Sequence, residues 1–571
     1  MFRERIIYFI VTLICLVLVF GLFNLQVVKG KRYKDLSDSN SIRLISKQGA
    51  RGKILDRSGE VIVDSQLFFD AIVLPQDVSS LDRELKIVAD VLERDPLELK
   101  KIYRAGFIAP AVPVTLAKNI NIKKAISLEE LKPELAGIVI QPRPARRYPY
   151  AGLASHVIGY VNEIDRWRLT QLQDYGYKTK DLVGFGGVEE KYDYYLRGEA
   201  GGLSLQVNHR GKSVRVLGFE SPSSGKDIQL TLNLKAQKIA ESVLAGRKGC
   251  IIIMDPYSGE IIVMASAPGF NPESFVNKSN STIAGYFNDP GAPLINRAIT
   301  GAYPAGSIFK VIVATGALET KKINSSTSFL CQGFILVGKQ EFKCWSTHGL
   351  QDLIGALAHS CNVFFYKAGF LTGAPALHEY SLRFGLAKTS GCELPYEAAG
   401  YIPSPLLRKI KRFKNWFDGD TANFSIGQGD VLVTPLQMAR MMAVFANNGY
   451  LVTPCIIKSI AGEDILTKQK KAVNLHLKNS TIDYVRQGLK AVVANPEGTG
   501  HVLADLSVTV AGKTGTAQAP PGQPHAWFTG FFPYNEPRFV ICVFLEHGGP
   551  GYYSCVAAKQ VIEEMIKEGL I

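Results

Sequence analysis

The sequence has no internal repeat and no long low-complexity tract, although it contains 571 residues. Charged residues make up 20% of the chain and hydrophobic residues 46%, which excludes a disordered protein and predicts a globular one with an ample core. Runs of lysine and arginine with interleaved aromatic residues are also missing. The net charge of +14 would suit an anionic polymer or a membrane surface, but we expect no nucleic-acid partner.

The nine cysteines are an odd number and do not form the pattern of a small disulfide scaffold. Cys15 lies in a long apolar run, whereas Cys250 and Cys542 lie in short strand-like runs typical of a buried core. A chain of this length is too long for one ordinary domain, so we expect two or more folded units.

An apolar run starts at Ile6 and continues to Val28 with only two weak polar interruptions. At about 1.5 Å per residue, a helix of this length spans a hydrocarbon core of about 30 Å. Because no Ala-x-Ala cleavage site follows, we interpret residues 6–28 as an uncleaved transmembrane anchor after a tail of residues 1–5. A buried helix of a soluble protein is the alternative. Basic residues flank both ends, so charge does not determine the orientation.

A segment rich in serine, proline and glycine, Ser221–Lys226, has the composition of a linker. The preceding residues, 29–226, mix short strand-like runs with charged helical segments such as Leu81 to Tyr103. The following residues, 227–571, start with a strand-like run and a helical stretch from Leu234 to Leu244. This change of pattern predicts a domain boundary at the linker.

The second domain shows a hairpin signal, because apolar runs at 251–254 and 261–264 flank a turn at Asp255–Gly259. Further strand-like runs follow a central helical region, at residues 508–510, 527–532 and 539–545. Strands at both ends with helices between them predict an antiparallel sheet flanked by helices, so the fold class is α+β.

The first of three short motifs in this domain is Ser307 followed by Lys310, with Pro304 and Gly306 before it and an apolar helical run after it. A helix that starts at Ser307 would place Lys310 on the same face, with its ammonium near the serine hydroxyl. A serine hydroxyl becomes a good nucleophile only when a base takes its proton. Lysine can be that base when burial or another cation lowers its pKa.

The second motif, Ser360–Asn362, adds a hydroxyl and an amide. The third, Lys513–Thr516, adds a cation and two hydroxyls on a predicted strand, with a glycine that would let substrate approach the backbone. Taken alone, the three motifs could be a helix cap, a turn and an edge strand, and Ser223 with Lys226 repeats the first by chance. Their joint order, with spacings of 53 and 153 residues, is typical of penicillin-recognising serine enzymes.

Residues 227–571 resemble the transpeptidase domain of class B penicillin-binding proteins, most closely the elongation-type penicillin-binding protein 2 subfamily. Ser425–Gly429 and His525–Gly530 resemble family segments on either side of the third motif. Upstream, Arg51–Arg57 and Gly184–Glu189 resemble parts of the family's non-catalytic domain. The resemblance therefore covers nearly the whole chain.

The resemblance implies an elongated non-catalytic pedestal of the dimerisation type at residues 29–226 and a β-lactamase-like transpeptidase domain at residues 227–571. It implies a serine D,D-transpeptidase that cross-links peptidoglycan stem peptides, with D,D-carboxypeptidase side activity and with β-lactams that stall at the acyl stage. The family roles carry over to catalytic residues Ser307, Lys310, Ser360, Asn362 and Lys513, and to substrate-binding residues Thr514, Gly515 and Thr516.

In the mechanism that the resemblance implies, Ser307 attacks the D-Ala-D-Ala carbonyl with Lys310 as base, and Ser360 relays a proton to the leaving D-alanine. Asn362 would hold the donor amide, and the backbone N–H groups of Ser307 and Thr516 would form the oxyanion hole. The resemblance also implies a single-pass protein of the bacterial cytoplasmic membrane, with its catalytic domain outside the cytoplasm. Its partners would be a SEDS-family glycosyltransferase and other membrane proteins of the elongation complex.

Four potential metal ligands lie around the second motif, spaced C-x12-C-x3-H-x12-C: Cys331, Cys344, His348 and Cys361. Three sulfurs and one imidazole suit tetrahedral zinc, and some penicillin-binding proteins of the similar subfamily place zinc here. If Ser360 and Asn362 face the cleft, Cys361 faces away toward such an ion, which would brace the loop from behind. A Cys331–Cys344 disulfide in an oxidising compartment is the alternative.

Several other functions stay open as alternatives. A division-type class B protein would share every motif. A serine β-lactamase would need a group that activates water, and it would not need an anchor or a 190-residue N-terminal module. A β-lactam sensor or wall scaffold would not need both lysines, and we find no glycosyltransferase-like acidic motif before residue 227 that would indicate a bifunctional enzyme.

Overall fold

The computed structural model describes residues 2–34, 42–110, 112–207, 213–466 and 472–571. It divides into two compact units, and the chain passes between them several times. The first contains Met1–Arg51, Ser65–Ala145 and Arg197–Gly225. The second contains Gly52–Asp64, Arg146–Leu196 and Lys226–Ile571. The second unit thus includes segments from within the predicted pedestal, and the limits predicted for the domains stay predictions.

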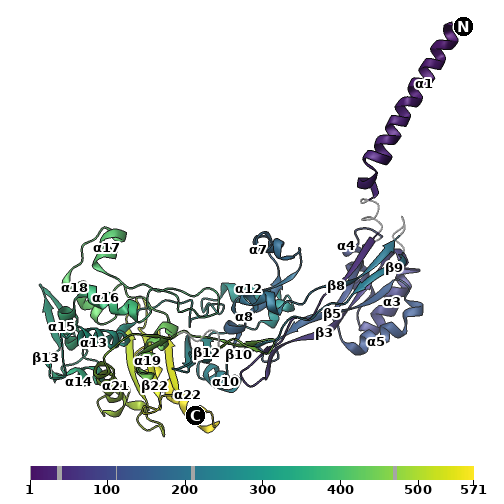
Figure 1. Ribbon diagram of the computed structural model, residues 1–571. Helices are drawn as coiled ribbons and strands as arrows, with labels where there is room; N and C mark the ends of the chain where they lie inside the picture. Colours follow the sequence, from purple (N-terminus) through teal and green to yellow (C-terminus); the bar gives the residue numbers. More distant parts are fainter. Residues whose placement is uncertain (1, 35–41, 111, 208–212, 467–471) are drawn as a thin grey trace. The chain divides into compact units, whose positions relative to one another are not determined.

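The predicted apolar helix is present as α1 (Phe2–Phe23), which continues into a π-helical turn, η1 (Asn24–Val28). Its apolar part, Arg5–Val28, has 24 residues and a mean hydropathy of 3.0, and its side chains are exposed along its whole length. Figure 1 shows it at the N-terminal end of the chain. Its length and composition are sufficient to cross a membrane. Met1 of the predicted tail lies outside the described residues.

The first unit contains helices α3 (Leu81–Leu92), α4 (Pro96–Gly106) and α5 (Ile122–Glu130), which pack against strands β3, β4 and β5. The strands span Val61–Val73, Val114–Ile120 and Ile138–Arg147, and β3 pairs antiparallel with β4. A separate sheet joins β1, β8 and β9, at Ile42–Lys47, Gly201–Val207 and Ser213–Glu220.

The helical segment expected at residues 81–103 is present as two helices, α3 and α4. Glu93 adopts a left-handed conformation that ends α3, and the Asp95 side chain accepts a hydrogen bond from the Leu97 N–H to cap α4. Pro96 occupies the first turn of α4, where its missing N–H costs nothing.

The second unit is built around a five-stranded antiparallel sheet with the order β12-β11-β23-β22-β21. The strands span Ile261–Ala267, Gly249–Met254, Phe539–Leu545, His525–Phe532 and Ala511–Ala517 in that order. The predicted hairpin and the joining of distant segments into one sheet are confirmed. The strand expected at 508–510 starts instead at Ala511, whose partner on β22 is Phe531.

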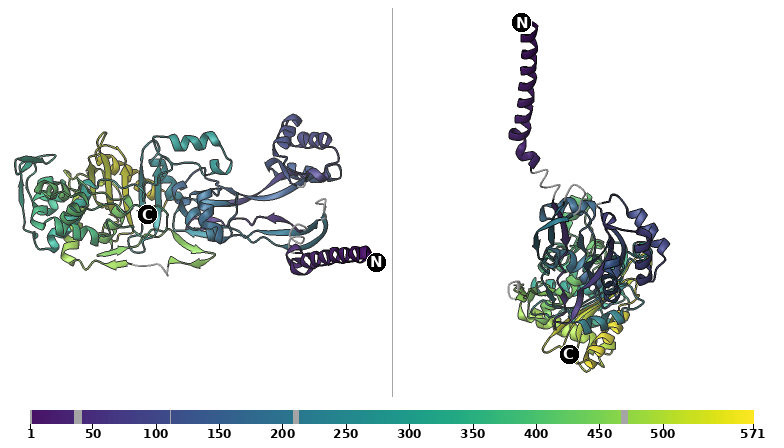
Figure 2. Two further views of the ribbon diagram at one scale, coloured as in Figure 1. Left: turned by 90° about the horizontal axis from the view of Figure 1, so that it is seen from above. Right: turned by 90° about the vertical axis from the view of Figure 1, so that its right-hand side faces the viewer.

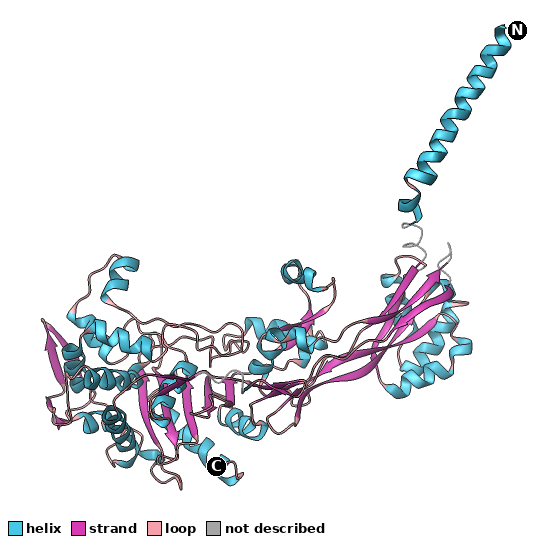
Figure 3. Cartoon of the chain, in the orientation of Figure 1, coloured by secondary structure: helices cyan, strands magenta, loops and turns pink. Residues whose placement is uncertain are grey.

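Both faces of this sheet are buried at β11 and β23, because these two strands are apolar throughout and successive side chains point to opposite faces. Ile251 and Ile253 belong to one hydrophobic cluster, whereas Ile252 and Met254 belong to the other. Helices α10 (Leu234–Val243) and α22 (Tyr552–Lys567) cover the first face, and α19 (Pro435–Ala446) packs on the second (Figures 1 and 2). Figure 3 shows the helices that flank these strands, which confirms the α+β class.

Further helices carry or support the candidate site, and each contributes buried side chains to the same hydrophobic cluster as α19. They are α13 (Lys310–Glu319), α14 (Leu353–Ala358), α15 (Asn362–Thr372), α18 (Asp418–Ser425) and α21 (Asn479–Ala494). Two two-stranded antiparallel sheets lie between α13 and α14 in the chain: β14 and β15 form a hairpin, and β13 pairs with β16 on either side of it in the sequence. Their strands span Phe329–Cys331, Gly349–Gln351, Phe334–Val337 and Gln340–Lys343.

Candidate active site

Ser307 lies in a short 3-10 turn, η5 (Gly306–Phe309), that runs directly into α13, which confirms the predicted helix start. Gly306 has φ of +55°, and a Cβ added there would lie 2.9 Å from the carbonyl oxygen of Thr516 on strand β21. The Gly306 N–H donates to Gly427 O at 2.9 Å. Only glycine permits this close approach, which brings the serine next to the third motif.

The Lys310 ammonium is fully buried and lies against the second motif. It donates to the Ser360 carbonyl oxygen at 2.7 Å, to Ser360 Oγ at 3.2 Å and to Asn362 Oδ1 at 2.6 Å. Among the described residues, no hydrogen bond joins it to Ser307. Burial lowers the pKa of Lys310 to about 8, because the charged form loses its water. A lysine can act as a base only when its pKa is lowered, and burial lowers the pKa of Lys310 in this way.

Ser360 connects α14 to α15 and has φ of +53°, a left-handed conformation that is unusual for a residue with a side chain. The turn exposes the Ser360 and Asn362 side chains to a cleft. Cys361 is fully buried on the other side, where its sulfur accepts the Phe364 N–H and caps α15. The predicted division of this motif into two faces is confirmed.

The third motif lies on the edge strand β21, as predicted. Lys513 is fully buried, and its Nζ donates to Thr514 O at 3.2 Å. Burial, with the charge of Lys310 as a second cause, holds the pKa of Lys513 well below its usual range. The Thr514 hydroxyl donates to Thr499 Oγ1 at 2.7 Å, and Thr516 Oγ1 accepts from the Gly551 N–H at 3.0 Å.

Close packing requires a glycine at position 515, which the sequence did not reveal. A Cβ there would lie 3.0 Å from Ile308 Cγ1 and 3.1 Å from Trp527 Cβ, so a larger residue would push β21 away from η5, the turn that contains Ser307. The Trp527 indole N–H donates to Pro304 O at 3.1 Å, which further fixes the segment before Ser307. The approach of substrate to the backbone at Gly515 stays a prediction.

The three motifs meet at one cleft of about 890 Å³. Ser307, Ser360, Asn362, Thr514 and Thr516 line it. Within the described part of the chain, the lining does not include Lys310, Lys513 or Gly515, which lie behind the surface.

Further side chains line the cleft that the sequence analysis did not identify as site residues: Glu341, Trp345, Tyr366, Asn423, Gln428, Thr499, Gln518 and Tyr552. Two signals were available, because Gln428 lies in the family-like segment Ser425–Gly429 and Trp345 lies between the predicted metal ligands. Thr499, between two glycines, carries no comparable signal.

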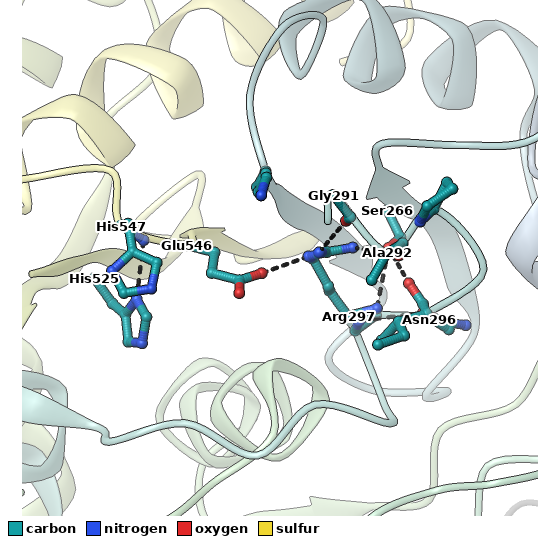
Figure 4. A network of polar contacts seen from close by, with 12 residues as sticks. Ser266, Gly291, Ala292, Asn296, Arg297, His525, Glu546 and His547 are labelled. Atoms are coloured by element: carbon teal, nitrogen blue, oxygen red, sulfur yellow. Dashed lines mark hydrogen bonds and ion pairs between the residues drawn. The ribbon is translucent and has the colours of Figure 1, made fainter. Parts of the chain in front are cut away.

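A polar network fixes the segment that precedes η5, the turn that contains Ser307 (Figure 4). Arg297, only 3% exposed, forms an ion pair with Glu546 at 2.6 Å and donates to the Gly291 carbonyl at 2.7 Å. The Arg297 N–H donates to Ser266 Oγ on β12 at 3.0 Å. A buried charge pair is tolerated when hydrogen bonds satisfy the remaining donors, as they do here. The network ties the loop to the edge strand β12 and to the residue that follows the central strand β23.

Figure 4 also shows the contact between His525 and His547. The His547 backbone N–H donates to His525 Nδ1 at 3.0 Å. Burial, and then the nearby His547, lower the pKa of His525 to about 4, so its ring is neutral near pH 7. The Tyr303 ring contacts the His525 ring edge-on, with centroids 5.5 Å apart. These contacts hold the segment around Tyr303, which precedes η5, against strand β22.

The four predicted metal ligands converge behind the second motif. The ligand atoms of Cys331, Cys344, His348 and Cys361 all lie within 4.8 Å of one another. His348 Nδ1 is 3.6 Å from Cys331 Sγ and 3.5 Å from Cys344 Sγ. A tetrahedron of sulfurs at about 2.3 Å from zinc has edges of about 3.8 Å, so the donor set fits the ion.

The cluster contacts the Ser-x-Asn loop (Ser360–Asn362) directly, because the Asn362 N–H donates to Cys344 Sγ at 3.2 Å. The hydrogen bond between Cys361 and Cys344 lowers the pKa of Cys344 and raises the pKa of Cys361, so the two thiols share a proton with the thiolate favoured on Cys344. All nine cysteines of the chain are free, so Cys331 and Cys344 are two thiols here.

Comparison with known proteins agrees with this geometry. Residues 249–567 match the family described as the penicillin-binding protein transpeptidase domain, and residues 46–230 match the penicillin-binding protein dimerisation domain. A peptidoglycan D,D-transpeptidase MrdA of Acinetobacter baumannii is 30% identical, over 98% of this chain and 87% of the relative. The MrdA of Escherichia coli is 29% identical, over 96% of this chain and 92% of the relative.

Solved structures are similar along most of the chain. Penicillin-binding protein 2 of Helicobacter pylori, alone, has a TM-score of 0.80 at 28% identity and covers 92% of this chain and 100% of its own. The complex of that protein with MreC gives a TM-score of 0.81 at 27% identity, over 93% of this chain and 99% of the matched chain. The chain therefore belongs to the penicillin-binding protein transpeptidase family, to its class B and to the elongation-type penicillin-binding protein 2 group.

Proposed function

We propose that the chain is a peptidoglycan D,D-transpeptidase of the cell-elongation type, acylated on Ser307 by a stem peptide that ends in D-Ala-D-Ala. The observation that carries the proposal is the meeting of three motifs at one cleft, where a buried lysine with a pKa of about 8 lies behind a serine at a helix start. The MrdA relatives support the substrate class by their name.

In the first step the Ser307 hydroxyl attacks the carbonyl between the two D-alanines and loses its proton to the neutral Lys310 amine. The backbone N–H groups of Ser307 and Thr516 donate to the developing oxyanion, an effect worth about 3–4 kcal/mol in such sites. Lys310 lies 3.2 Å from Ser360 Oγ, so the proton can pass through that hydroxyl to the leaving D-alanine amine. The C–N bond breaks, and the acyl-enzyme ester remains.

In the second step the amine of another stem peptide attacks the ester and gives up a proton along the same path. Ser307 leaves as the alcohol, and the new peptide bond completes the cross-link. A β-lactam opens on Ser307 in the same way but leaves no departing amine, so the enzyme stalls. Water in place of the amine would produce D,D-carboxypeptidase side activity.

Recognition of the donor peptide falls to groups on both sides of the cleft. Asn362 holds the donor amide, and the exposed hydroxyl of Thr516 donates to the terminal carboxylate. Thr514 and Gly515 shape the strand along which the peptide lies. Lys513 lies beneath that strand, so its contribution is to the electrostatic field at the carboxylate and not to direct contact.

Cys331, Cys344, His348 and Cys361 would hold one zinc ion in this proposal. Four protein ligands leave no open position, so the ion would supply structure and not a Lewis acid. The residues themselves brace the loop, because Cys344 receives the Asn362 N–H at 3.2 Å. The reduced thiols favour this role over the Cys331–Cys344 disulfide.

We infer that α1 anchors the protein in the bacterial cytoplasmic membrane, with residues 29–226 as the pedestal and 227–571 as the catalytic domain, both outside the cytoplasm. The membrane-embedded synthesis of the glycan makes a SEDS-family glycosyltransferase a fitting partner. A second proposed partner is another protein of the elongation complex, which the complex of the Helicobacter pylori protein with MreC supports.

Labelling with a fluorescent penicillin tests the proposal. The wild-type chain should form one covalent adduct, which mass spectrometry should place on the peptide that contains Ser307. Ser307→Ala should abolish labelling, and Ser223→Ala, at the other serine with a lysine three residues later, should label like wild type. A stem pentapeptide with an added amine acceptor should yield a cross-linked product with wild type and with Ser223→Ala, but not with Ser307→Ala. No adduct, or an adduct at Ser223, would refute the proposal.

A further inference from the structure

A threonine outside the three motifs forms hydrogen bonds on both sides of the cleft. Thr499 follows α21 and lines the cleft. Its Oγ1 accepts the Thr514 hydroxyl at 2.7 Å, which connects it to strand β21. Its backbone N–H and its hydroxyl donate to the Ala358 carbonyl at 3.1 and 3.3 Å, which connects it to the end of α14. One side chain thus joins the third motif to the residues just before the second.

The same segment contacts the next residue of the loop. His359 Nε2 lies 3.5 Å from Asn495 Nδ2 and 3.7 Å from Glu497 Oε2. Residues 495–499 therefore hold the backbone at 358 and the ring at 359, the two positions that precede Ser360. The support comes from a part of the chain more than 130 residues further on.

Ser360 needs such support because of its backbone. A residue with a side chain persists in the left-handed region only when the surrounding structure imposes that conformation. The Ser360 carbonyl and hydroxyl also accept from Lys310, so this lysine and Thr499 both hold the loop, and Lys310 keeps its contacts to Ser360 when Thr499 changes. Ala358, two residues earlier, ends α14, and there Thr499 provides an anchor from outside the helix.

We propose that Thr499 is a positioning residue that sets the width of the cleft between the Ser-x-Asn loop and the Lys-Thr-Gly-Thr strand. The proposal rests on the transpeptidase function proposed above and assigns it a further residue. The Thr499 oxygen accepts one hydrogen bond while its proton makes another, so only a hydroxyl can fill both roles. Thr499→Ser keeps the pair of bonds, and the nearly isosteric Thr499→Val removes both side-chain bonds.

The test measures acylation by a fluorescent penicillin at several concentrations, which separates the dissociation constant of the first complex from the acylation rate constant. Thr499→Val should raise the dissociation constant about tenfold, the loss expected for a pair of neutral hydrogen bonds. Its acylation rate constant should change about threefold or less, because Ser307 and Lys310 are untouched. Thr499→Ser should restore binding to within about threefold of wild type.

Thr315→Val is the matched control, because the Thr315 hydroxyl is buried and donates to Val311 O at 2.8 Å inside α13, away from the cleft lining. It should lower the melting temperature and leave the dissociation constant unchanged. Thr499→Val with unchanged binding and only a lower melting temperature would show a merely structural role and overturn the proposal. If this variant does not fold, Thr499→Ala provides the same test, since it inserts no new volume.

A double-mutant cycle provides the second readout. If the two threonines act through their shared hydrogen bond, Thr499→Val should have almost no further effect on binding in a Thr514→Val background. Independent, multiplying losses would overturn the proposal. The proposed function fails separately, through an unlabelled wild type or a labelled Ser307→Ala, and neither result depends on Thr499.

Discussion

The turn of the proposed nucleophile Ser307 (the nucleophile turn, Gly306–Phe309) and the Ser-x-Asn loop (Ser360–Asn362) line the same cleft. Different kinds of contact hold the two. Ser307 starts an apolar helix whose side chains are buried almost throughout, and the packing of this helix adds to the distant contacts of Gly306 and Pro304 that hold the turn. Ser360 occupies a left-handed turn between two helices. Its loop is held from other segments, through the contact of Asn362 with Cys344 and that of Ala358 with Thr499.

This difference predicts how the two regions respond to substitution. A change at the nucleophile turn should alter the chemistry and leave binding close to normal. A change at a distant contact of the loop should loosen binding and stability first, because the loop loses its support while the nucleophile keeps its base. Lys310 is the point where the two regions touch, since its ammonium bonds to both Ser360 and Asn362.

The largest effect is expected at that junction. Lys310→Met keeps most of the buried volume but removes the base, so the acylation rate constant should fall by about 10³-fold, within the usual range for a general base. Stopped-flow acylation by a fluorescent penicillin measures it. Lys322→Met, at an exposed lysine after the same helix, should acylate like wild type. A loss smaller than tenfold in Lys310→Met would assign the base to another group.

The pH dependence of acylation should follow the same lysine. Only the neutral amine can accept the serine proton, and the pKa of Lys310 is lowered to about 8 by burial. The rate should therefore rise about tenfold per pH unit at acidic pH, then level off above about 8. The melting temperature over the same range serves as the control for unfolding. A rate that falls as the pH rises from 6 to 8 would contradict a lysine base.

A smaller effect is expected at the thiol and imidazole cluster, which supports the loop and not the nucleophile. His348→Ala should lower the melting temperature, reduce the bound zinc from about one per chain, and slow acylation by about tenfold. His378→Ala, at a histidine of the same unit outside the cluster, should keep the zinc. Elemental analysis and thermal unfolding measure the two quantities. If His348→Ala keeps all of its zinc, His348 is not a ligand of the ion.

The smallest effect concerns the backbone alone. Ser360→Gly and Ser360→Ala both lose the hydroxyl, but glycine accepts φ of +53° without strain, so the glycine variant should be more stable by about 1 kcal/mol. At Ser307, which is not among the described residues with a positive φ, the order should reverse. Denaturant unfolding of the four variants measures the differences. The same order at both positions would mean that the left-handed turn is not the source of strain.

The sequence by itself determined the class of the fold and most of the site. Periodic apolar patterns predicted the anchor helix, the hairpin of β11 and β12 and the later strands, because such patterns depend on neighbouring residues only. The order of three motifs predicted which side chains meet. Spacing placed Cys331, Cys344, His348 and Cys361 together, because all four lie within 31 residues of the chain.

The tertiary structure alone decided the rest, because long-range contacts leave no local pattern. It divided the helical segment at residues 81–103 into two helices at Glu93 and began β21 at Ala511. It turned the Lys310 ammonium toward Ser360 and placed Lys513 beneath its strand. It also brought Thr499 to the cleft, since a hydroxyl between two glycines acquires a role only when the folded chain places Ala358 and Thr514 within its reach.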